Sequence, residues 1–282
     1  LINSQATLQK YAKSLNKLMH NHNITAPQRV LYVSGMLLSM QDIQDELGNK
    51  IQDGLTPEDL KGIQTESKRD GIQIVNQIKE FLVAKNIPVD KQSLMLASFS
   101  EISKDAQRDE LTQLDKEVAK LINGQASSNK QIFTFIYQNI FLSIDAMAGH
   151  LDIMGEMYSE FLKYALGDGK EIGIVLTPPY VTKMMAQILN INQHSKVMDL
   201  ATGSAGFLIS AMELMIQDAE NTHGKKTTAA EDKIEKIKKT QLLGVELNAE
   251  MFTLAATNMI LRGDGSSNIQ KGNTFNTPEK LY

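Results

Sequence analysis

The sequence predicts an α/β protein in which an all-helical N-terminal domain precedes the first part of a parallel sheet. In the first half, apolar residues recur at helical spacing, and alternating strand patterns are scarce before residue 170. After residue 195, short apolar runs alternate with helical stretches, an order typical of a parallel sheet with helices on its faces. The glycine-containing stretch Leu166–Gly173 lies between the two parts, so we predict domains at residues 1–165 and 166–282.

The composition is that of an ordinary globular protein. The 282 residues suit about two domains, and a formal net charge of −4 excludes a uniformly basic nucleic-acid binder, although a local basic surface stays possible. The lack of cysteine excludes disulfides and cysteine zinc sites, and it fits a cytoplasmic protein. The five histidines are scattered without ligand spacing, so we expect no metal site. No stretch approaches about 18 apolar residues, so we expect no membrane-spanning helix.

Four stretches of the first half carry helical patterns. Pro27 suits the first turn of a helix through residues 29–40. The other three have one apolar face each, formed by Ile74, Ile78, Phe81 and Leu82; by Leu111, Leu114, Val118 and Leu121; and, within residues 130–150, by Ile132, Phe135, Ile136 and Ile140. Such faces are typical of helices that pack into a core, and we favour this interpretation over a cofactor site.

The second half alternates between strands and helices. The predicted order is a short buried strand at Lys196–Leu200, a helix at Gly206–Gln217, a strand at Leu242–Asn248, a helix at Ala249–Gly263 and a third strand within residues 267–275. A polar, lysine-rich segment at residues 217–240 interrupts this order. We favour a solvated excursion with a short charged helix over a DNA-contacting arm.

The loop Asp199–Gly206, with sequence DLATGSAG, follows the first predicted strand. Gly203 and Gly206 allow a tight turn and close approach to a ligand, and the free N–H groups of the next helix point into the same space. Such a loop is a weak signal alone. Glu246, at the carboxyl end of the second strand, strengthens it, because ligands of such sheets bind there and a carboxylate can accept both ribose hydroxyls.

A nicotinamide cofactor and a nucleoside triphosphate are the natural competitors for this loop. A Gly-x-Gly-x-x-Gly fingerprint places the acidic residue about 20 residues further on. Here the spacing of Gly203 and Gly206 differs, and Glu246 lies 40 residues beyond Gly206. A phosphate-binding P-loop needs Gly-Lys-Ser/Thr, which the loop lacks. Both alternatives are therefore disfavoured.

At these residues the sequence resembles the modification (M) subunits of type I restriction-modification systems, which are adenine-N6 DNA methyltransferases. The similarity runs from about Asp152 to Phe275 through five ordered elements: DIMGEMYSEFL, like Asp-x-x-Gly-x-x-Tyr-Glu; VLTPPYV, like Phe-Thr-Pro-x-x-Val; VMDLATGSAGFLI, like Asp-Pro-Ala-Cys-Gly-Ser-Gly-Gly-Phe-Leu; GVELN with ATNMILRG, like Gly-x-Glu-x-Asn and Asn-Met-x-Leu-x-Gly; and IQKGNTF, like Gly-Asp-Thr-Leu. The resemblance implies a Rossmann-like methyltransferase sheet, here its first part, after a helical domain.

The resemblance also implies S-adenosylmethionine (SAM) as the cofactor. It assigns nine residues: Thr177 and Pro178 near the amino-acid end of SAM; Asp199, Gly203, Ser204 and Gly206 as the floor under that end and the sulfonium; Glu246 on the ribose hydroxyls; Leu247 beside the adenine; and Asn273 at the adenine edge.

Five positions depart from the family pattern. Leu200 and Thr202 stand in place of Pro and Cys, and Ala205 in place of Gly. Asn273 stands in place of Asp, whose oxygen an amide can replace as a hydrogen-bond acceptor without the charge. Leu176 stands in place of Phe, which removes some packing area.

The family's catalytic tetrad is Asn-Pro-Pro-Tyr/Phe, and Thr177–Tyr180 resembles it with Thr first. The family mechanism flips the adenine out of the duplex, and the Asn oxygen and a Pro carbonyl accept hydrogens of its N6 amino group. The Thr177 hydroxyl is too short for that role, and the segment precedes the SAM loop, whereas the family tetrad follows the third strand. We therefore interpret Thr177 and Pro178 as a cofactor-side segment, with a plain helix start as the alternative.

No Asn-Pro-Pro-Tyr/Phe occurs in the sequence, so we expect the tetrad after Tyr282 and a fragment that is inactive alone. The alternatives are a SAM-dependent methyltransferase of RNA or protein, and a non-catalytic truncated docking module. The resemblance also implies partners: DNA, a specificity (S) subunit that chooses the DNA sequence, a restriction (R) subunit and a second M subunit.

Overall fold

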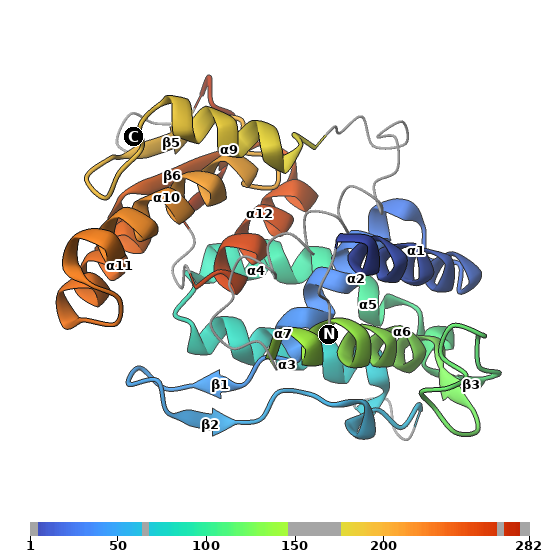
Figure 1. Ribbon diagram of the computed structural model, residues 1–282. Coiled ribbons are helices and arrows are strands. Elements are labelled where there is room, and N and C mark those ends of the chain that lie inside the picture. The colour runs from blue at the N-terminus through green and yellow to red at the C-terminus, as the bar shows by residue number, and fades with distance from the viewer. Residues whose placement is uncertain (1–4, 64–67, 146–175, 264–267, 277–282) are drawn as a thin grey trace. The chain divides into compact units, whose positions relative to one another are not determined.

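The chain forms two units, each of which is described by itself. One comprises Leu1–Lys85 and Val89–Val175, and the other Asn86–Pro88 and Leu176–Tyr282. The computed structural model describes residues 5–63, 68–145, 176–263 and 268–276 (Figure 1).

Three predicted features lie outside the described residues and stay predictions. They are the domain boundary at residues 165 and 166, the linker Leu166–Gly173 and the element DIMGEMYSEFL at residues 152–162.

The first unit is mainly helical. Its elements are α1 (Gln5–Asn21), α2 (Ala26–Ser39), β1 (Ile43–Gln44), β2 (Lys50–Gln52), the 3₁₀ turn η1 (Pro57–Asp59), α3 (Asp70–Ala84), α4 (Val89–Phe99), α5 (Glu101–Lys104), the 3₁₀ turn η3 (Ala106–Asp109), β3 (Leu111–Thr112), β4 (Ala126–Ser127), α6 (Ser128–Ile136), the π-helical turn η4 (Tyr137–Phe141) and α7 (Leu142–Asp145). The two short antiparallel pairings, β1 with β2 and β3 with β4, were not predicted from the sequence.

The helix predicted at residues 29–40, which is part of α2, and the helical faces predicted at α3 and α6 are confirmed. Pro27 lies in the first turn of α2, where Gln28 closes a capping box by accepting the N–H of Thr25 at 3.0 Å. The apolar faces of α3 and of α6 with η4 are buried: Ile74, Ile78, Phe81, Leu82, Ile132, Phe135, Ile136 and Ile140. These helices form the core of the first unit.

The helix predicted through Leu111, Leu114, Val118 and Leu121 is wrong. Leu111 starts β3 and is 58% exposed, and of the four only Val118 is fully buried. The carboxylate of Asp115 accepts the N–H of Glu117 at 2.9 Å, and the side chain of Gln131 accepts the N–H of Asp115 at 2.9 Å. These side-chain bonds replace helical backbone bonds, so the segment forms turns around one buried side chain.

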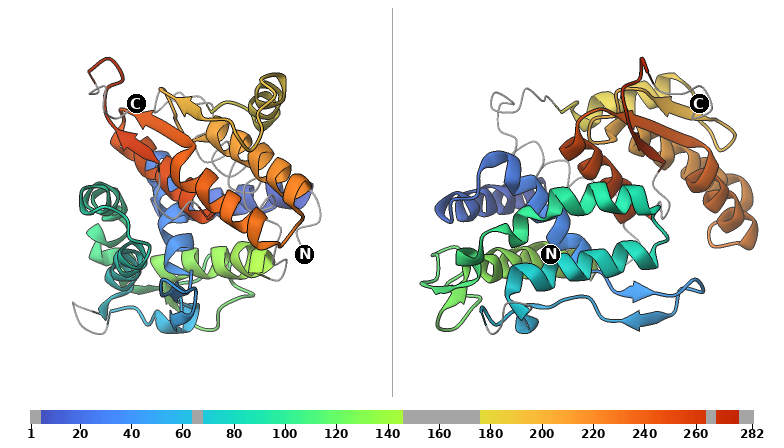
Figure 2. Two further views of the ribbon diagram at one scale, coloured as in Figure 1. Left: turned by 90° about the vertical axis from the view of Figure 1, so that its left-hand side faces the viewer. Right: turned by 180° about the vertical axis from the view of Figure 1, so that it is seen from behind.

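The second unit is a parallel sheet with helices. Its elements are α9 (Pro179–Ile188), β5 (Val197–Asp199), α10 (Gly206–His223), α11 (Thr228–Thr240), β6 (Leu242–Glu246), α12 (Ala249–Leu261) and β7 (Ile269–Lys271). The strands lie in the order β5-β6-β7, and both pairings are parallel, as the sequence predicts. Helices α10 and α12 pack against the strands, as the turned views show (Figure 2).

The lysine-rich interruption contains one charged helix, α11, as predicted. Ala230 and Ile237 of α11 are buried, and most of its other residues lie at the surface. The prediction that Lys196–Leu200 is buried is wrong, because Met198 is 52% exposed. Within the described strands, β5 lies at the edge of the sheet and pairs with β6 alone. Among the described helices, none combines the length and the hydropathy that crossing a membrane requires.

Candidate functional site

The loop after β5 folds back over the carboxyl end of β6. In the parallel register Asp199 lies opposite Gly244, so β6 extends two residues further, to Glu246. The N–H of Thr202 donates to the carbonyl of Val245 at 3.0 Å, and its hydroxyl donates to the carbonyl of Asp199 at 2.7 Å. Thr202 is 4% exposed and so anchors the loop from inside.

The carboxylate of Glu246 is held by two backbone N–H groups. Gly203 donates to Oε2 at 2.9 Å, and Asn248 donates to Oε1 at 2.8 Å. Each carboxylate oxygen has a second lone-pair direction, so the group can still accept hydroxyl hydrogens from a ligand. The predicted ribose residue therefore also shapes the predicted cofactor loop.

The left-handed backbone of the loop falls on Gly203 and Ala205. Their φ angles are +55° and +71°, whereas Gly206 lies outside the left-handed region. A Cβ on Gly206 would meet Thr182 Cγ2 at an ordinary 3.5 Å. Ala205 therefore adopts a left-handed conformation that strains an L-residue, at the position where the family pattern has glycine. At Gly206, by contrast, the surrounding chain leaves room for a side-chain methyl group.

Asp199 is a poorly satisfied carboxylate at the end of β5. Its Oδ1 accepts the N–H of Ala201 at 3.1 Å, but its Oδ2 is buried and has no hydrogen-bond partner within the described residues. Burial raises the pKa of Asp199; the Ala201 N–H opposes this, and the negative charge of Glu246 adds to it. Two nearby carboxylates with an unused oxygen favour a cationic ligand and disfavour a pyrophosphate.

The structure places Thr177 and Pro178 at the start of α9. Pro178 is the N-cap residue of this helix, and Thr177 is exposed. One turn later, Thr182 Oγ1 lies 2.8 Å from Ser210 Oγ of α10, and its methyl group lies beside Gly206. The start of α9 therefore lies beside the start of α10, next to the loop.

The two residues assigned to the adenine lie beyond β6 and β7. Leu247 is 62% exposed, and Asn273 is exposed as well. The Oδ1 of Asn273 accepts the N–H of Phe275 at 3.0 Å, which forms a turn after β7. Both side chains are therefore at the surface next to the end of β6.

Two residues that hold the loop carry no role in the sequence prediction. Asn258 of α12 donates from Nδ2 to the carbonyl of Ser204 at 3.0 Å, and Thr274 donates from Oγ1 to the carbonyl of Leu200 at 2.5 Å. Both lie inside segments that resemble family motifs, ATNMILRG and IQKGNTF. Their positions in those segments were the available signal, but their contacts are long-range.

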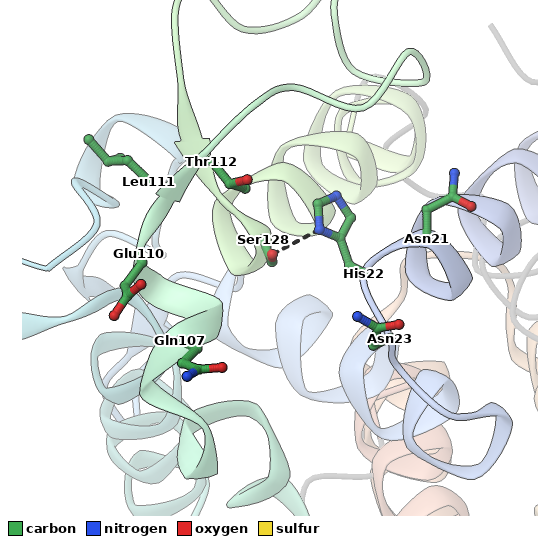
Figure 3. A pocket seen from close by; sticks show the side chains of 8 residues that line it. All are labelled: Asn21, His22, Asn23, Gln107, Glu110, Leu111, Thr112 and Ser128. Carbon is green, nitrogen blue, oxygen red and sulfur yellow. Dashed lines mark hydrogen bonds between the residues drawn. The ribbon is translucent and has the colours of Figure 1, made fainter.

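A pocket of about 400 Å³ lies in the first unit (Figure 3). Its lining comes from the end of α1, η3, β3 and the start of α6: Asn21, His22, Asn23, Gln107, Glu110, Leu111, Thr112 and Ser128. His22 Nδ1 and Ser128 Oγ lie 2.8 Å apart, and burial lowers the pKa of His22. No lysine or arginine lines the pocket, and none of the predicted site residues is there.

Comparison with known proteins assigns the region of the loop. Residues 149–281 match the family described as N-6 DNA Methylase. All nine predicted cofactor residues lie inside this region, whereas the described residues of the helical first unit lie outside it. The resemblance found in the sequence is thereby confirmed.

The N-6 DNA methylase region and the helices before it also have relatives over nearly their whole length. The type II restriction enzyme and methyltransferase RM.BcgI of Heyndrickxia coagulans is 31% identical over 268 residues, which are 94% of this chain and 38% of that protein. The chain therefore spans less than half the length of this relative.

Two solved structures share the fold. One, a modification subunit of a type I restriction enzyme from Vibrio vulnificus YJ016, is 14% identical with a TM-score of 0.57, over 99% of this chain and 58% of that one. The other, from a type I restriction-modification system, is 16% identical with a TM-score of 0.55, over 96% and 51%. The predicted fold class, a helical domain followed by part of a Rossmann-like methyltransferase fold, is confirmed.

Proposed function

We propose that this chain is part of the M subunit of a type I restriction-modification system, which transfers a methyl group from SAM to N6 of adenine in DNA. The observation that carries the proposal is the hydrogen bond that joins the loop at residues 199–206 to Glu246, inside the region that matches the N-6 DNA methylase family. The division at residues 165 and 166 into a helical domain and a SAM-binding part belongs to the same proposal.

The carboxylates of Asp199 and Glu246 fit SAM. SAM carries a sulfonium and an ammonium group against one carboxylate, so it is a net cation. The unpaired Oδ2 of Asp199 and the neighbouring Glu246 are acceptors of matching charge. The phosphates of a dinucleotide would instead add negative charge beside two carboxylates, which supports SAM over NAD.

Each predicted residue has a role in this proposal. Asp199 and the loop residues Gly203, Ser204 and Gly206 form the floor under the amino-acid end and the sulfonium, next to Thr177 and Pro178 at the start of α9. Glu246 accepts the ribose hydroxyls, and Leu247 and Asn273 lie along the adenine. Bound SAM supplies an electrophilic methyl group on its sulfonium, and the chain's part is to hold and orient it.

Methyl transfer also needs acceptors for the adenine amino hydrogens. The sequence contains one Pro-Pro pair, in Thr177-Pro178-Pro179-Tyr180, and no Asn-Pro-Pro-Tyr/Phe tetrad. Pro178 and Pro179 begin α9, which supports a cofactor-side role for this segment. We infer that these 282 residues bind SAM without transferring its methyl group, and that the tetrad belongs to a longer subunit.

The partners of the proposed M subunit are DNA, an S subunit, an R subunit and a second M subunit. The net charge of −4 fits phosphate contacts that are shared among subunits. A DNA substrate and the absence of cysteine from the sequence fit a cytoplasmic location.

Calorimetric titration of the purified 282-residue chain with SAM and with NAD tests the cofactor. We expect saturable binding of SAM and none of NAD; binding of NAD alone would refute the proposal. A parallel assay with radiolabelled SAM and DNA should show no methyl transfer, and transfer above background would refute the inferred inactivity.

A further inference from the structure

The segment after β7 crosses the carboxyl end of β6. Thr274, which follows β7, donates from Oγ1 to the carbonyl of Leu200, which follows β5. Because β6 lies between them, β5 and β7 are about 10 Å apart. A hydrogen bond from Thr274, after β7, to Leu200, after β5, therefore requires the chain to pass over the end of β6. The N–H of Gly272 donates to the carbonyl of Glu246 at 2.9 Å and starts this crossing.

A second side chain holds the far part of the same loop. Asn258, in the last turn of α12, is 4% exposed and donates from Nδ2 to the carbonyl of Ser204 at 3.0 Å. Thr274 and Asn258 therefore each hold a carbonyl of the loop, at Leu200 and at Ser204. Between these two held carbonyls, the N–H of Gly203 donates to Glu246 at 2.9 Å.

We propose that Thr274 and Asn258 are positioning residues of the cofactor loop. They contact loop carbonyls at either side of Gly203 and set the geometry in which its N–H meets Glu246. Thr274 also holds the segment that carries Asn273 across the end of β6, next to the cofactor loop. This inference rests on the proposed SAM site, and it extends that site to two residues in α12 and after β7.

Isosteric substitutions separate positioning from bulk packing. Thr274→Val removes the hydroxyl and keeps the volume, whereas Thr274→Ser keeps the hydroxyl. Thr240→Val is the matched control, because Thr240 makes the same bond to a carbonyl, that of Lys236, within α11. We expect Thr274→Val to weaken SAM binding about fivefold to tenfold, and Thr274→Ser and Thr240→Val to bind as the wild type does.

The same comparison applies to the amide. Asn258→Leu removes the donor to Ser204, and Asn268→Leu is its control, because Asn268 donates to the carbonyl of Lys238 at 2.6 Å, away from the loop. Only Asn258→Leu should weaken SAM binding. Thermal unfolding without SAM, measured for all variants, identifies any loss that merely follows stability.

Amide hydrogen exchange of the ligand-free chain makes the test independent of SAM. In Thr274→Val and Asn258→Leu, the Ala201 and Gly203 amides should exchange faster than in the wild type and the two controls. Unchanged exchange in both variants would overturn the positioning role, whether or not SAM binds. Failure of the wild type to bind SAM, with faster exchange in the variants, would refute the proposed function and leave the loop ties standing.

Discussion

The backbone N–H of Gly203 donates a 2.9 Å hydrogen bond to Oε2 of Glu246, 43 residues further along the chain. This bond joins the loop after β5 to the end of β6. The two residues, which the resemblance assigns to different parts of SAM, are thus directly bonded to each other. Changes at Glu246 should therefore alter the loop as well as the ribose contact.

The left-handed backbone of Ala205 predicts an unusual mutational response. Ala205→Gly should change the free energy of unfolding by less than about 1 kcal/mol, because relief of about 1–2 kcal/mol of strain offsets the lost methyl burial and the freer unfolded chain. Ala205→Val should cost more than about 2 kcal/mol. Ala230, equally buried but helical in α11, is the control. Ala230→Gly should lower the free energy of unfolding, measured with urea, by about 1–2 kcal/mol. An equal loss in Ala205→Gly would contradict the left-handed conformation of Ala205.

Gly244 predicts a steric response within β6. A Cβ there would lie 2.5 Å from Thr202 Oγ1 and 2.8 Å from Ile269 Cδ1, so Gly244→Ala must displace the loop or the strand. We expect a loss of about 1–3 kcal/mol in the free energy of unfolding. Gly206→Ala, whose Cβ would meet Thr182 at 3.5 Å, is the comparison and should cost less than about 0.5 kcal/mol. Similar losses in both variants would argue against the close packing of Thr202 under β6.

The raised pKa of Asp199 predicts a pH-dependent affinity. Burial is the main cause, and the charge of Glu246 adds to it. A bound cation favours the ionised carboxylate and so lowers the pKa of Asp199. At pH values near this pKa, SAM binding should therefore release protons. Affinity should therefore rise with pH through the pKa of Asp199 and then level off. Titrations in buffers of different ionisation enthalpy measure the protons released; the release should vanish in Asp199→Asn.

Asp70 predicts a pH effect on the stability of the first unit. Its carboxylate is fully buried, accepts the N–H of Gly62 at 2.9 Å and the hydroxyl of Ser127 at 2.5 Å, and lies near Asp109. Burial is the main cause that raises the pKa of Asp70 to about 6.

Folding favours the protonated form of Asp70, so the contribution of this group to the free energy of unfolding falls as the pH rises. The stabilisation is complete below about pH 4, the pKa of an unfolded Asp, and it is lost as the pH rises towards 6, by about 3 kcal/mol at most. Urea unfolding between pH 3.5 and pH 7 measures this loss. Relative to the wild type, Asp70→Asn should lack this part of the pH dependence; identical pH profiles would contradict the raised pKa.

Much of the second unit could be predicted from the sequence because its signals are local. The apolar runs at β5, β6 and β7 and the helical stretches between them indicate a parallel sheet directly. The exposure of Met198 could not be predicted, because a strand's burial depends on which neighbours it pairs with. In the first unit, the turn around Val118 depends on Gln131, which lies outside the local pattern that predicted a helix.

The site shows the same division. Family-like motifs locate Asp199, Gly203 and Glu246, and the structure brings them together. The bonds from Asn258 and Thr274 to loop carbonyls span 54 and 74 residues, and no local pattern of apolar or polar residues encodes them. Their side chains are ordinary in sequence, and only the fold gives them a partner.

Calorimetric titration of SAM into Glu246→Ala tests the central claim most directly. Glu246→Ala removes both the ribose acceptor and the partner of the Gly203 N–H, so we expect at least about a tenfold loss of affinity. Glu250→Ala, an exposed carboxylate four residues away on α12, should bind SAM as the wild type does. SAM binding by Glu246→Ala that equals the wild type would contradict the assignment of Glu246 and the loop at residues 199–206 as the cofactor site.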